Sequence, residues 1–201
     1  ASVAATNLIQ LLDRVKLDAG GAIAVALARS SVAATLNANA TLGGGALLDA
    51  AGTVYFGAGN AGTAYASANA KTYGLAGAAQ GDSVSIVDAN GTVGIASGAR
   101  IRAEGDITLA AGRNADGAAD ALQAIARTDL YNKTAFPVET DPDADAVVNH
   151  TATVDVAAGG RVDSVEDIAL IADRGLLVAD GQGVGKDLYR EILAAIGSFF
   201  S

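Results

Sequence analysis

The chain has 201 residues, of which 51% are apolar but only 4% aromatic, so it can bury a long, thin core of small side chains rather than a wide globular one. It contains no cysteine, which excludes a disulfide framework, thiol catalysis and a cysteine-based zinc site. Its net charge is −9 and its basic residues are scattered singly along the sequence, a distribution that predicts no binding of nucleic acid.

The chain also contains no methionine, and its longest apolar runs fall far below the roughly 20 residues that a membrane-spanning helix requires. We therefore interpret residues 1–201 as one repetitive segment of a longer protein, and we expect no membrane insertion by this segment. The acidic balance favours solubility and the binding of cations.

The first predicted element is a short helix over Asn7–Leu17. Its leucines and Val15 recur at helical spacing, and the side chain of Asn7 can cap the first turn. Small and branched residues then alternate over residues 21–42, a pattern that predicts two short strands.

An internal repeat is the most informative feature of the chain. Residues 92–113 align without a gap with residues 153–174, at an offset of 61 residues and with ten identical positions. A weaker copy over residues 42–59 aligns with residues 95–112 at an offset of 53. In each copy every second side chain of two short strands is apolar, and self-similarity of this kind predicts a solenoid built by stacking.

Stacking predicts a ladder of inward apolar side chains, because a single coil about 5 Å thick cannot bury its core without a neighbour. The predicted ladder consists, copy by copy, of Leu48, Val54 and Phe56; of Ile95, Ile101, Ile107 and Leu109; and of Val156, Val162, Ile168 and Leu170.

Between the second and third copies, residues 114–152 are predicted to form a loop or insertion. The segment holds both prolines and the only histidine, and Pro137 and Pro142 disfavour regular pairing within a central strand. A helical turn or two is expected near its start, over Ala118–Arg127.

After the third copy, residues 175–185 are expected to be loop and residues 186–200 to form an amphipathic C-terminal helix. The apolar side of that helix would consist of Leu188, Ile192, Ile196 and Phe199 or Phe200. The glycines of Gly181–Asp187 resemble a phosphate-binding loop, but Asp180 and Asp187 occupy positions where that motif requires Gly and Ser or Thr. We interpret them instead as a flexible connection to the helix.

The candidate metal site is a row of carboxylates at Asp141, Asp143 and Asp145, beside Glu139. Carboxylates at every second position of an extended loop can wrap oxygen ligands around Ca²⁺, so a calcium site is a hypothesis for this segment. Ala146 stands where an EF-hand loop has its sixth-position glycine, and a solvated acidic turn is the alternative interpretation. No other cofactor is expected.

The sequence gives little support for catalysis. His150 is the only imidazole, has neither a cysteine nor a second histidine to pair with, and is expected on the surface. Acidic residues at matching places in two copies are interpreted as turn residues, since a single active site would break the repeat; they are Glu104, Asp106, Glu166 and Asp167. Potential N-glycosylation triplets begin at Asn39, Asn90, Asn132 and Asn149, and we attribute them to chance.

Three segments carry a resemblance to a known family: residues 127–146 (RTDLYNKTAFPVETDPDADA), 98–113 (GARIRAEGDITLAAGR) and 185–198 (GKDLYREILAAIGS). Together they resemble the repeat region of leukotoxin-type filamentous adhesins, which are similar to filamentous haemagglutinin. The resemblance covers nearly the whole chain. It implies a right-handed parallel β-helix without shared catalytic residues, in a very large exoprotein that passes through an outer-membrane secretion partner to the bacterial cell surface.

The expected fold is therefore all-β, a right-handed parallel β-helix (solenoid) with short helical insertions near the N-terminus and at the C-terminus. The expected function is that of a stalk segment that gives an extracellular adhesin rigidity and surface display, without catalysis. Contact with a host or neighbouring-cell receptor or glycan would belong to the parent protein, and self-association into filaments is a further expectation. The alternatives are a β-helical carbohydrate-active enzyme or glycan-binding module, which would need a groove of clustered charged and aromatic residues, and an ice- or mineral-binding solenoid, which would need threonine ladders.

Overall fold

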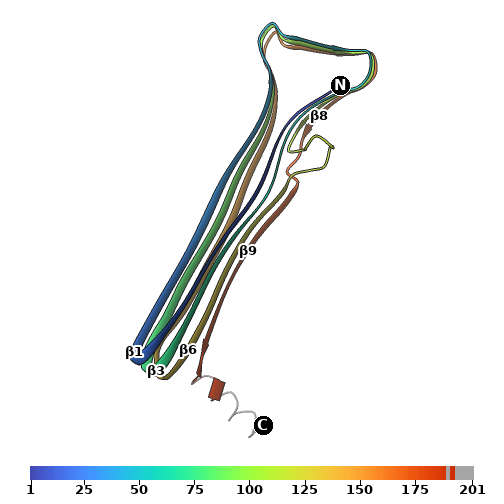
Figure 1. Ribbon diagram of the computed structural model, residues 1–201. Helices are drawn as coiled ribbons and strands as arrows, with labels where there is room; N and C mark the ends of the chain where they lie inside the picture. The colour runs from blue at the N-terminus through green and yellow to red at the C-terminus, as the bar shows by residue number, and fades with distance from the viewer. Residues whose placement is uncertain (189–190, 193–201) are drawn as a thin grey trace, which may run out of the picture.

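The structure is a computed structural model that describes residues 1–188, 191 and 192, and within these residues every named element is a β-strand. The strands pair in parallel and form a curled sheet together with a smaller three-stranded sheet (Figure 1). They are β1 (Ser2–Leu42), β2 (Leu47–Ala50), β3 (Val54–Ile95), β4 (Arg100–Ala103), β5 (Ile107–Ala111), β6 (Ala121–Val156), β7 (Arg161–Ser164), β8 (Ile168–Ala172) and β9 (Leu176–Asp187).

Each of the long strands β1, β3 and β6 reverses direction near its middle (Figure 1). Hydrogen bonds join the two halves: in β1 the Ser30 hydroxyl donates to Asp13 Oδ2 at 2.8 Å, and in β3 the Ser85 hydroxyl donates to the Ala64 carbonyl at 2.8 Å. We call the half before the bend the descending limb and the half after it the ascending limb. The descending limbs are residues 2–20, 54–73 and 121–134, and the ascending limbs are residues 23–42, 76–95 and 139–156.

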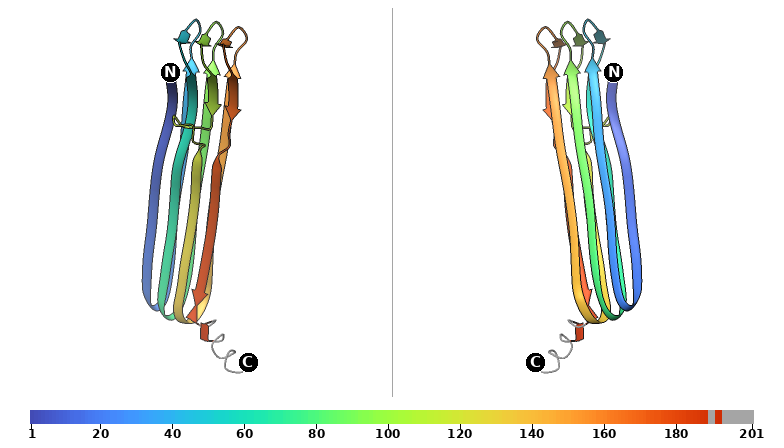
Figure 2. Two further views of the ribbon diagram at one scale, coloured as in Figure 1. Left: turned by 90° about the vertical axis from the view of Figure 1, so that its right-hand side faces the viewer. Right: turned by 90° about the vertical axis from the view of Figure 1, so that its left-hand side faces the viewer.

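Successive coils stack in register, which confirms the repeat read from the sequence. β1 pairs with β3 from Ser2↔Tyr55 to Leu42↔Ile95, an offset of 53 residues. β3 pairs with β6 at an offset that changes from 60 to 61 at an irregularity next to Gly77. The two views of Figure 2 show the equivalent limbs of successive coils side by side.

The predicted stacking of the apolar ladder is confirmed column by column, although Val156, Ile168 and Leu170 of the last copy are exposed. Val54 pairs with Ile107, which pairs with Ile168. The other columns of the ladder are Leu48, Ile101 and Val162; Phe56, Leu109 and Leu170; and Ile95 with Val156.

The core has two widths. At one end of each coil, the short strands β2, β4 and β7 form a third side, and the enclosed space holds large side chains (Figure 1). This wide end buries Val54, Phe56, Ile95, Ile101, Ile107 and Leu109. Along the limbs the space between the two halves is narrow, and alanine dominates the buried positions, for example Ala26, Ala28, Ala64, Ala66, Ala68, Ala124 and Ala126.

The helix predicted over Asn7–Leu17 is wrong, because these residues lie in the descending limb of β1. There the chain alternates with a period of two: Leu8 and Leu12 point to solvent, while Leu11 and Val15 pack against the core. Pairing with β3 over the whole limb hydrogen-bonds one edge of the strand, so tertiary pairing overrides the local helical spacing. The helical turns expected over Ala118–Arg127 are absent for the same reason, since β6 begins at Ala121.

The loop or insertion predicted over residues 114–152 is also wrong for most of its length, since only residues 112–120 leave the sheet. Both prolines are accommodated in β6. Pro137 lies at the bend, and Pro142 lies in the ascending limb, which among the described strands pairs only with β3 because β9 pairs only with residues 121–132 of β6. An edge position tolerates proline, since one side of the strand has no hydrogen-bonded neighbour.

The predictions for residues 175–200 can be compared with the structure only as far as the described residues extend. Residues 175–185, expected to be loop, belong mostly to β9. Of the helix predicted over residues 186–200, Lys186 and Asp187 end β9, Leu188, Glu191 and Ile192 are helical, and the remainder lies outside the described residues. Within the described part of the chain, no helix has the length and hydropathy of a membrane span.

Candidate functional site

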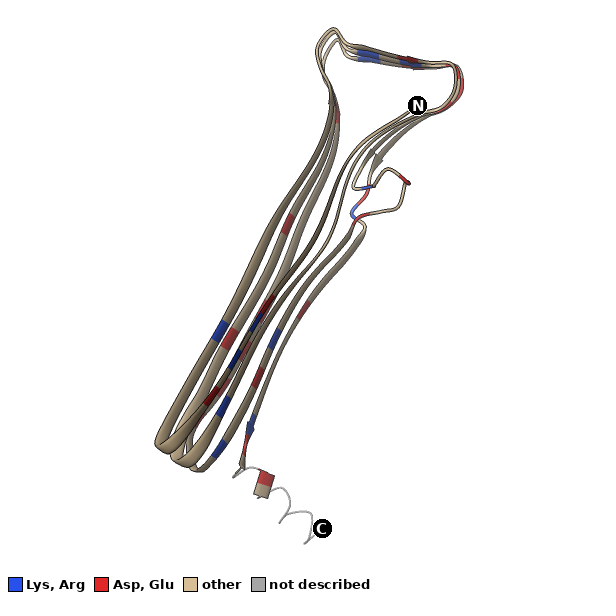
Figure 3. Cartoon of the chain, in the orientation of Figure 1, with Lys and Arg blue, Asp and Glu red and all other residues tan. Residues whose placement is uncertain are grey.

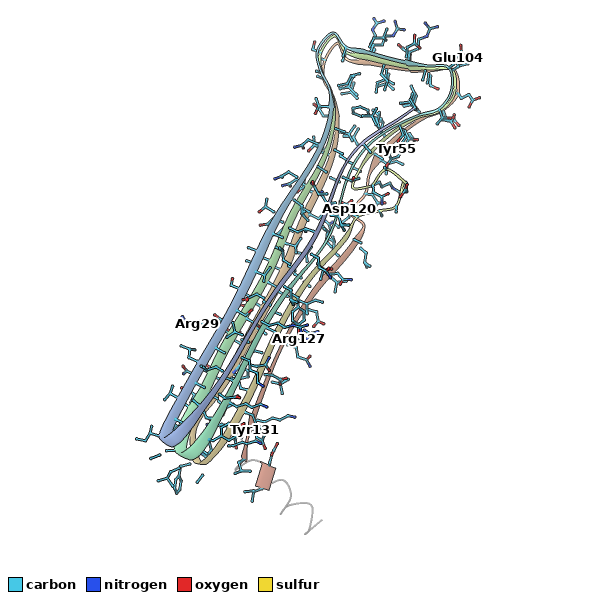
Figure 4. All side chains as sticks on the ribbon, viewed as in Figure 1. Arg29, Tyr55, Glu104, Asp120, Arg127 and Tyr131 are labelled. Carbon is cyan, nitrogen blue, oxygen red and sulfur yellow. The ribbon has the colours of Figure 1, made fainter. Side chains whose placement is uncertain are left out.

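The most chemically varied region surrounds residues 112–120, where the chain leaves the sheet between β5 and β6 (Figure 4). The excursion begins at Gly112, whose φ of +78° favours glycine and whose added Cβ would collide with the Asp173 carbonyl. Tyr55 of β3 holds the excursion from outside, since its hydroxyl donates to the Asn114 carbonyl at 2.7 Å. Burial raises the pKa of the Tyr55 hydroxyl, so it remains protonated and able to donate.

Asp120 closes the excursion and lies in the core. Its Oδ1 accepts a hydrogen bond from the Asn60 backbone amide at 2.7 Å, and its Oδ2 lies 2.8 Å from His150 Nε2. The side chains of Asp120 and His150 are 0% and 1% exposed. The prediction that His150 lies on the surface is therefore wrong: the ring points inward from the ascending limb of β6 and joins that limb to the start of the descending one.

A column of polar side chains continues from this pair through the stack. Asn7, Asn60 and Asp120 occupy equivalent positions in three successive coils. The Asn7 amide donates to Asn60 Oδ1, and the Asn60 amide donates to the Asn90 carbonyl, both at 3.0 Å. The same inward position is thus polar in three successive coils, and each group finds a partner on a neighbouring coil or the opposite limb.

An ion pair fixes the outer side of the excursion. Arg113 Nη2 lies 2.8 Å from Asp173 Oδ2, and Arg113 Nη1 donates to the Gly117 carbonyl at 2.9 Å. The pKa of Asp173 is lowered, chiefly because the carboxylate accepts a hydrogen bond from the Gly175 backbone amide and then because of Arg113. An open pocket of about 240 Å³ lies beside the excursion, lined in part by Asn7, Asn60, Asn114 and Asp116.

The Asp120–His150 pair has the geometry of a structural contact between two limbs and not of a catalytic dyad. A general base must reach a nucleophile or a substrate proton, yet within the described chain the His150 ring hydrogen-bonds only to Asp120 and is almost completely shielded from solvent. What the arrangement does chemically is satisfy a buried carboxylate from two directions, as a buried charge requires.

The carboxylates proposed as calcium ligands do not converge. Asp141, Asp143 and Asp145 are exposed and lie on one side of the ascending limb of β6, where alternate residues are about 6.7 Å apart. The first and last are thus about 13 Å apart along the strand, too far to share an ion whose ligand distances are about 2.4 Å. Among the described residues, no group of three or more acidic or imidazole side chains is arranged to hold a metal.

The repeated acidic residues lie in turns, as expected. Glu104 and Asp106 fall between β4 and β5, and Glu166 and Asp167 fall between β7 and β8. Asp106 Oδ1 accepts a hydrogen bond from the Asp167 backbone amide at 3.1 Å, so one turn supports the next along the stack.

The glycines of Gly181–Asp187 lie in β9 and not in a flexible connection, which corrects our interpretation of them. An added Cβ at Gly181 would collide with the Ala144 carbonyl of the ascending limb of β6, so this glycine permits close approach of the two limbs. Of the potential glycosylation sites, Asn132 is fully buried and its amide donates to the Gly77 carbonyl at 2.7 Å, whereas Asn39, Asn90 and Asn149 are exposed.

Two charged faces are present that the linear sequence did not reveal (Figure 3). The outward side of the descending limbs, continued by β9 where it pairs with the descending limb of β6, carries all four lysines, two arginines and three tyrosines, and we call it the basic face. Its residues are Arg14, Lys16, Lys71, Arg127, Lys133 and Lys186, with Tyr65, Tyr73 and Tyr131.

The outward side of the ascending limbs is the acidic face. It carries Asp82, Asp88, Glu139, Asp141, Asp143, Asp145 and Asp155. The signal that could have found both faces is the coil offset combined with a period of two, because charges that are single in the sequence become neighbours once equivalent strands stack.

Comparison with protein-family models, curated proteins and solved structures yields no match. Inference about function therefore begins from the geometry described above.

Proposed function

We propose that this chain is a stalk segment of a large extracellular bacterial filamentous adhesin, in which a stiff stack of coils provides reach and surface display and no reaction is catalysed. The observation that carries the proposal is the in-register pairing of three successive coils, at offsets of 53 and then 60 to 61 residues. Coils that pair in register over an inward apolar ladder can be repeated without limit, which is what a stalk requires.

We further propose that the coils close into a right-handed parallel β-helix. Hydrogen bonds between limbs, such as those from Asn132 to Gly77 and Glu139, support closure at the bend. The short strands β2, β4 and β7 support closure at the wide end, because they pair only with one another and bridge the two limbs of each coil. The right-handed sense follows the general rule for crossovers between parallel strands of one sheet.

Stiffness follows from the way this stack is stabilised. The 41-residue β1 and the 42-residue β3 pair along almost their whole length, and β6 pairs with β3 on its other side, so bending the axis would break many backbone hydrogen bonds together. In stacks of this kind stability grows with the number of coil interfaces, because each coil contacts only its neighbours.

Secretion and adhesion enter the proposal through the resemblance to leukotoxin-type filamentous adhesins. The parent would leave the cell through an outer-membrane secretion partner and be displayed at the cell surface, where a receptor or glycan is bound by other parts of it. The absence of cysteine is compatible with folding outside the cell, since the fold does not depend on disulfides.

Insertion of additional coils tests the stalk. Residues 54–106 form one coil of 53 residues, so four tandem copies inserted after Asp106 should extend the particle by about 19 Å along the stacking axis and raise its melting temperature. The matched control uses 52-residue copies, residues 54–105, because a one-residue slip sends the inward side chains to the solvent side. Equal lengths for both proteins in small-angle scattering, or turnover of a polysaccharide by the natural chain, would contradict the proposal.

A further inference from the structure

Two of the six cations of the basic face, Arg14 and Lys133, lie against tyrosine rings. The Arg14 guanidinium lies 5.3 Å from the centroid of Tyr65, and Lys133 Nζ lies 4.6 Å from the centroid of Tyr131 and 5.7 Å from that of Tyr73. Each ring thereby fixes a cation from a neighbouring position while leaving its charge accessible to solvent. None of the four lysines forms an ion pair within the described chain.

Six cations on this face are opposed by four carboxylates, two of which already have partners. Asp180 is bound by Arg127, and Glu191 accepts a hydrogen bond from the Tyr131 hydroxyl at 2.7 Å. Asp18 and Asp129 are the other two carboxylates among the described residues of the face, so the six cations exceed the carboxylates by two. The uncompensated charge of the basic face is therefore positive, although the whole chain has a net charge of −9.

The acidic face has the opposite balance, with seven carboxylates and Arg29 as its one arginine (Figure 4). Asp143 lies beside Asp82, and Asp82 lies beside Arg29, in adjacent coils. Glu139 accepts a hydrogen bond from the Gln80 amide at 2.6 Å, which orients the carboxylate without neutralising it. Asp141, Asp143 and Asp145 have no cation opposite them in β3.

The two faces point in opposite directions, because they are the outer sides of limbs whose inner sides pack against each other. On both faces the charges occupy one lattice, with a spacing of about 4.8 Å between coils and about 6.7 Å between alternate residues of a strand. A basic face and an acidic face of two identical molecules therefore share the same spacings, so rows of opposite charge can lie against each other over several coils.

We propose that this protein associates side by side with a second copy of itself, the basic face of one copy resting on the acidic face of the other. Such an interface is heterologous, since each copy uses two different patches, and so it leaves one basic and one acidic face free for further copies. The result is a lateral array of stalks held by charge. The inference rests on the described strands alone and does not depend on the assignment to an adhesin.

Analytical ultracentrifugation of the natural chain gives the first test. We expect the average mass to rise with protein concentration at about 20 mM salt and to return to that of a monomer at about 500 mM, because screening weakens exposed charge pairs. A mass that stays monomeric at low salt overturns the proposal.

Charge reversal on each face gives the decisive test. Reversal of either face should weaken self-association at least about tenfold, because the basic-face variant then carries negative charge on both faces and the acidic-face variant loses the net negative charge of its acidic face. Mixing the two variants should restore association, now between unlike molecules. The variants are K16E/K71E/K133E for the basic face and D141K/D143K/D145K for the acidic face.

The matched control places the same charge change elsewhere. R100E/R102E/R161E alters the exposed side of β4 and β7 in the small sheet, adds as much negative charge as the basic-face variant, and should associate like the natural chain. Circular dichroism establishes that each variant is folded. Association that survives in both face variants, or a mixture that stays monomeric, would show that open strand edges or another contact are responsible and would overturn the proposal.

Discussion

The wide end and the limbs of this molecule use the same strand pairing to enclose two different cores. At the wide end three sides surround Phe56, Ile101 and Leu109, which are large and almost fully buried. Along the limbs two sides face each other across alanine and glycine, as at Ala66 and Gly181. The comparison shows that a stacked fold does not need a large apolar core along its whole length, provided that the backbone ladders continue through both regions.

The limbs compensate for their small side chains with polar contacts between their inner surfaces. The hydroxyls of Ser83 and Thr128 lie 2.8 Å apart in the core, and Asn132 hydrogen-bonds across the bend. These buried groups are all satisfied, so they cost little desolvation energy and they specify which residues oppose each other. The wide end depends on apolar area, whereas the limbs depend on close fit and correct pairing.

Ile107→Asp should give the largest effect, because it places an unpaired charge in the wide core, where Ile107 is 0% exposed. We expect a loss of about 5 kcal/mol in the free energy of unfolding, measured by urea denaturation. Ile168→Asp is the matched control, since it occupies the same column one coil later but is 46% exposed. Equal losses of unfolding free energy for the two variants would contradict the conclusion that the wide core is buried at Ile107 and exposed at Ile168, in the last layer.

Asp120→Ala should come next, because the pair with His150 lies where the wide end meets the limbs (Figure 4). Removal of the carboxylate leaves the His150 ring and the Asn60 amide buried without their partner, and we expect a loss of about 3 kcal/mol. Asp116→Ala changes an exposed carboxylate of the same excursion and should cost less than about 0.5 kcal/mol. The Asp120–His150 pair would have no structural role if both variants melted at the temperature of the natural chain.

Ala66→Leu tests the close fit of the limbs. Ala66 is fully buried between them, so a larger side chain must push the limbs apart, and we expect a loss of about 2 kcal/mol. Ala33→Leu makes the same change on an outward position of an ascending limb and should be nearly neutral. A limb that accepted Leu at position 66 without loss would have a looser core than its alanines indicate.

The register of the repeated strands could be predicted from the sequence, whereas features that depend on contacts with a distant strand could not. The column of Val54, Ile107 and Ile168 followed from the offsets of 53 and 61, because a repeat fixes register directly. The descending limb at residues 7–17 was misread as a helix, since leucine spacing is a local signal and the pairing that overrides it involves residues about 53 positions away. Gly181 was misread because sequence gives no sign of which backbone approaches a glycine.

The Asp120–His150 pair could not be predicted from the sequence for the same reason. Asp120 and His150 are 30 residues apart and belong to opposite limbs, so neither spacing nor composition brings them together. The charged faces were hidden by the scatter of single charges, although the period of two and the coil offset contain the information once the strands are known.

Acidification should give the smallest effect on stability. It tests the ion pair that holds residues 112–120 separately from the rest of the molecule. The pKa of Asp173 is held below its ordinary value of 3.8 by the Gly175 amide and Arg113, so its contribution to stability is present above about pH 4 and is lost as the pH falls through the lowered value. Asp173→Asn should therefore melt slightly below the natural chain at pH 6, and the difference should shrink as the pH falls below 3.8 and through the lowered pKa of Asp173. Melting temperatures recorded for both proteins across this range isolate Asp173 from the other carboxylates. A difference that persisted unchanged at the lowest pH would mean that the anchor depends on the shape of the turn and not on its charge.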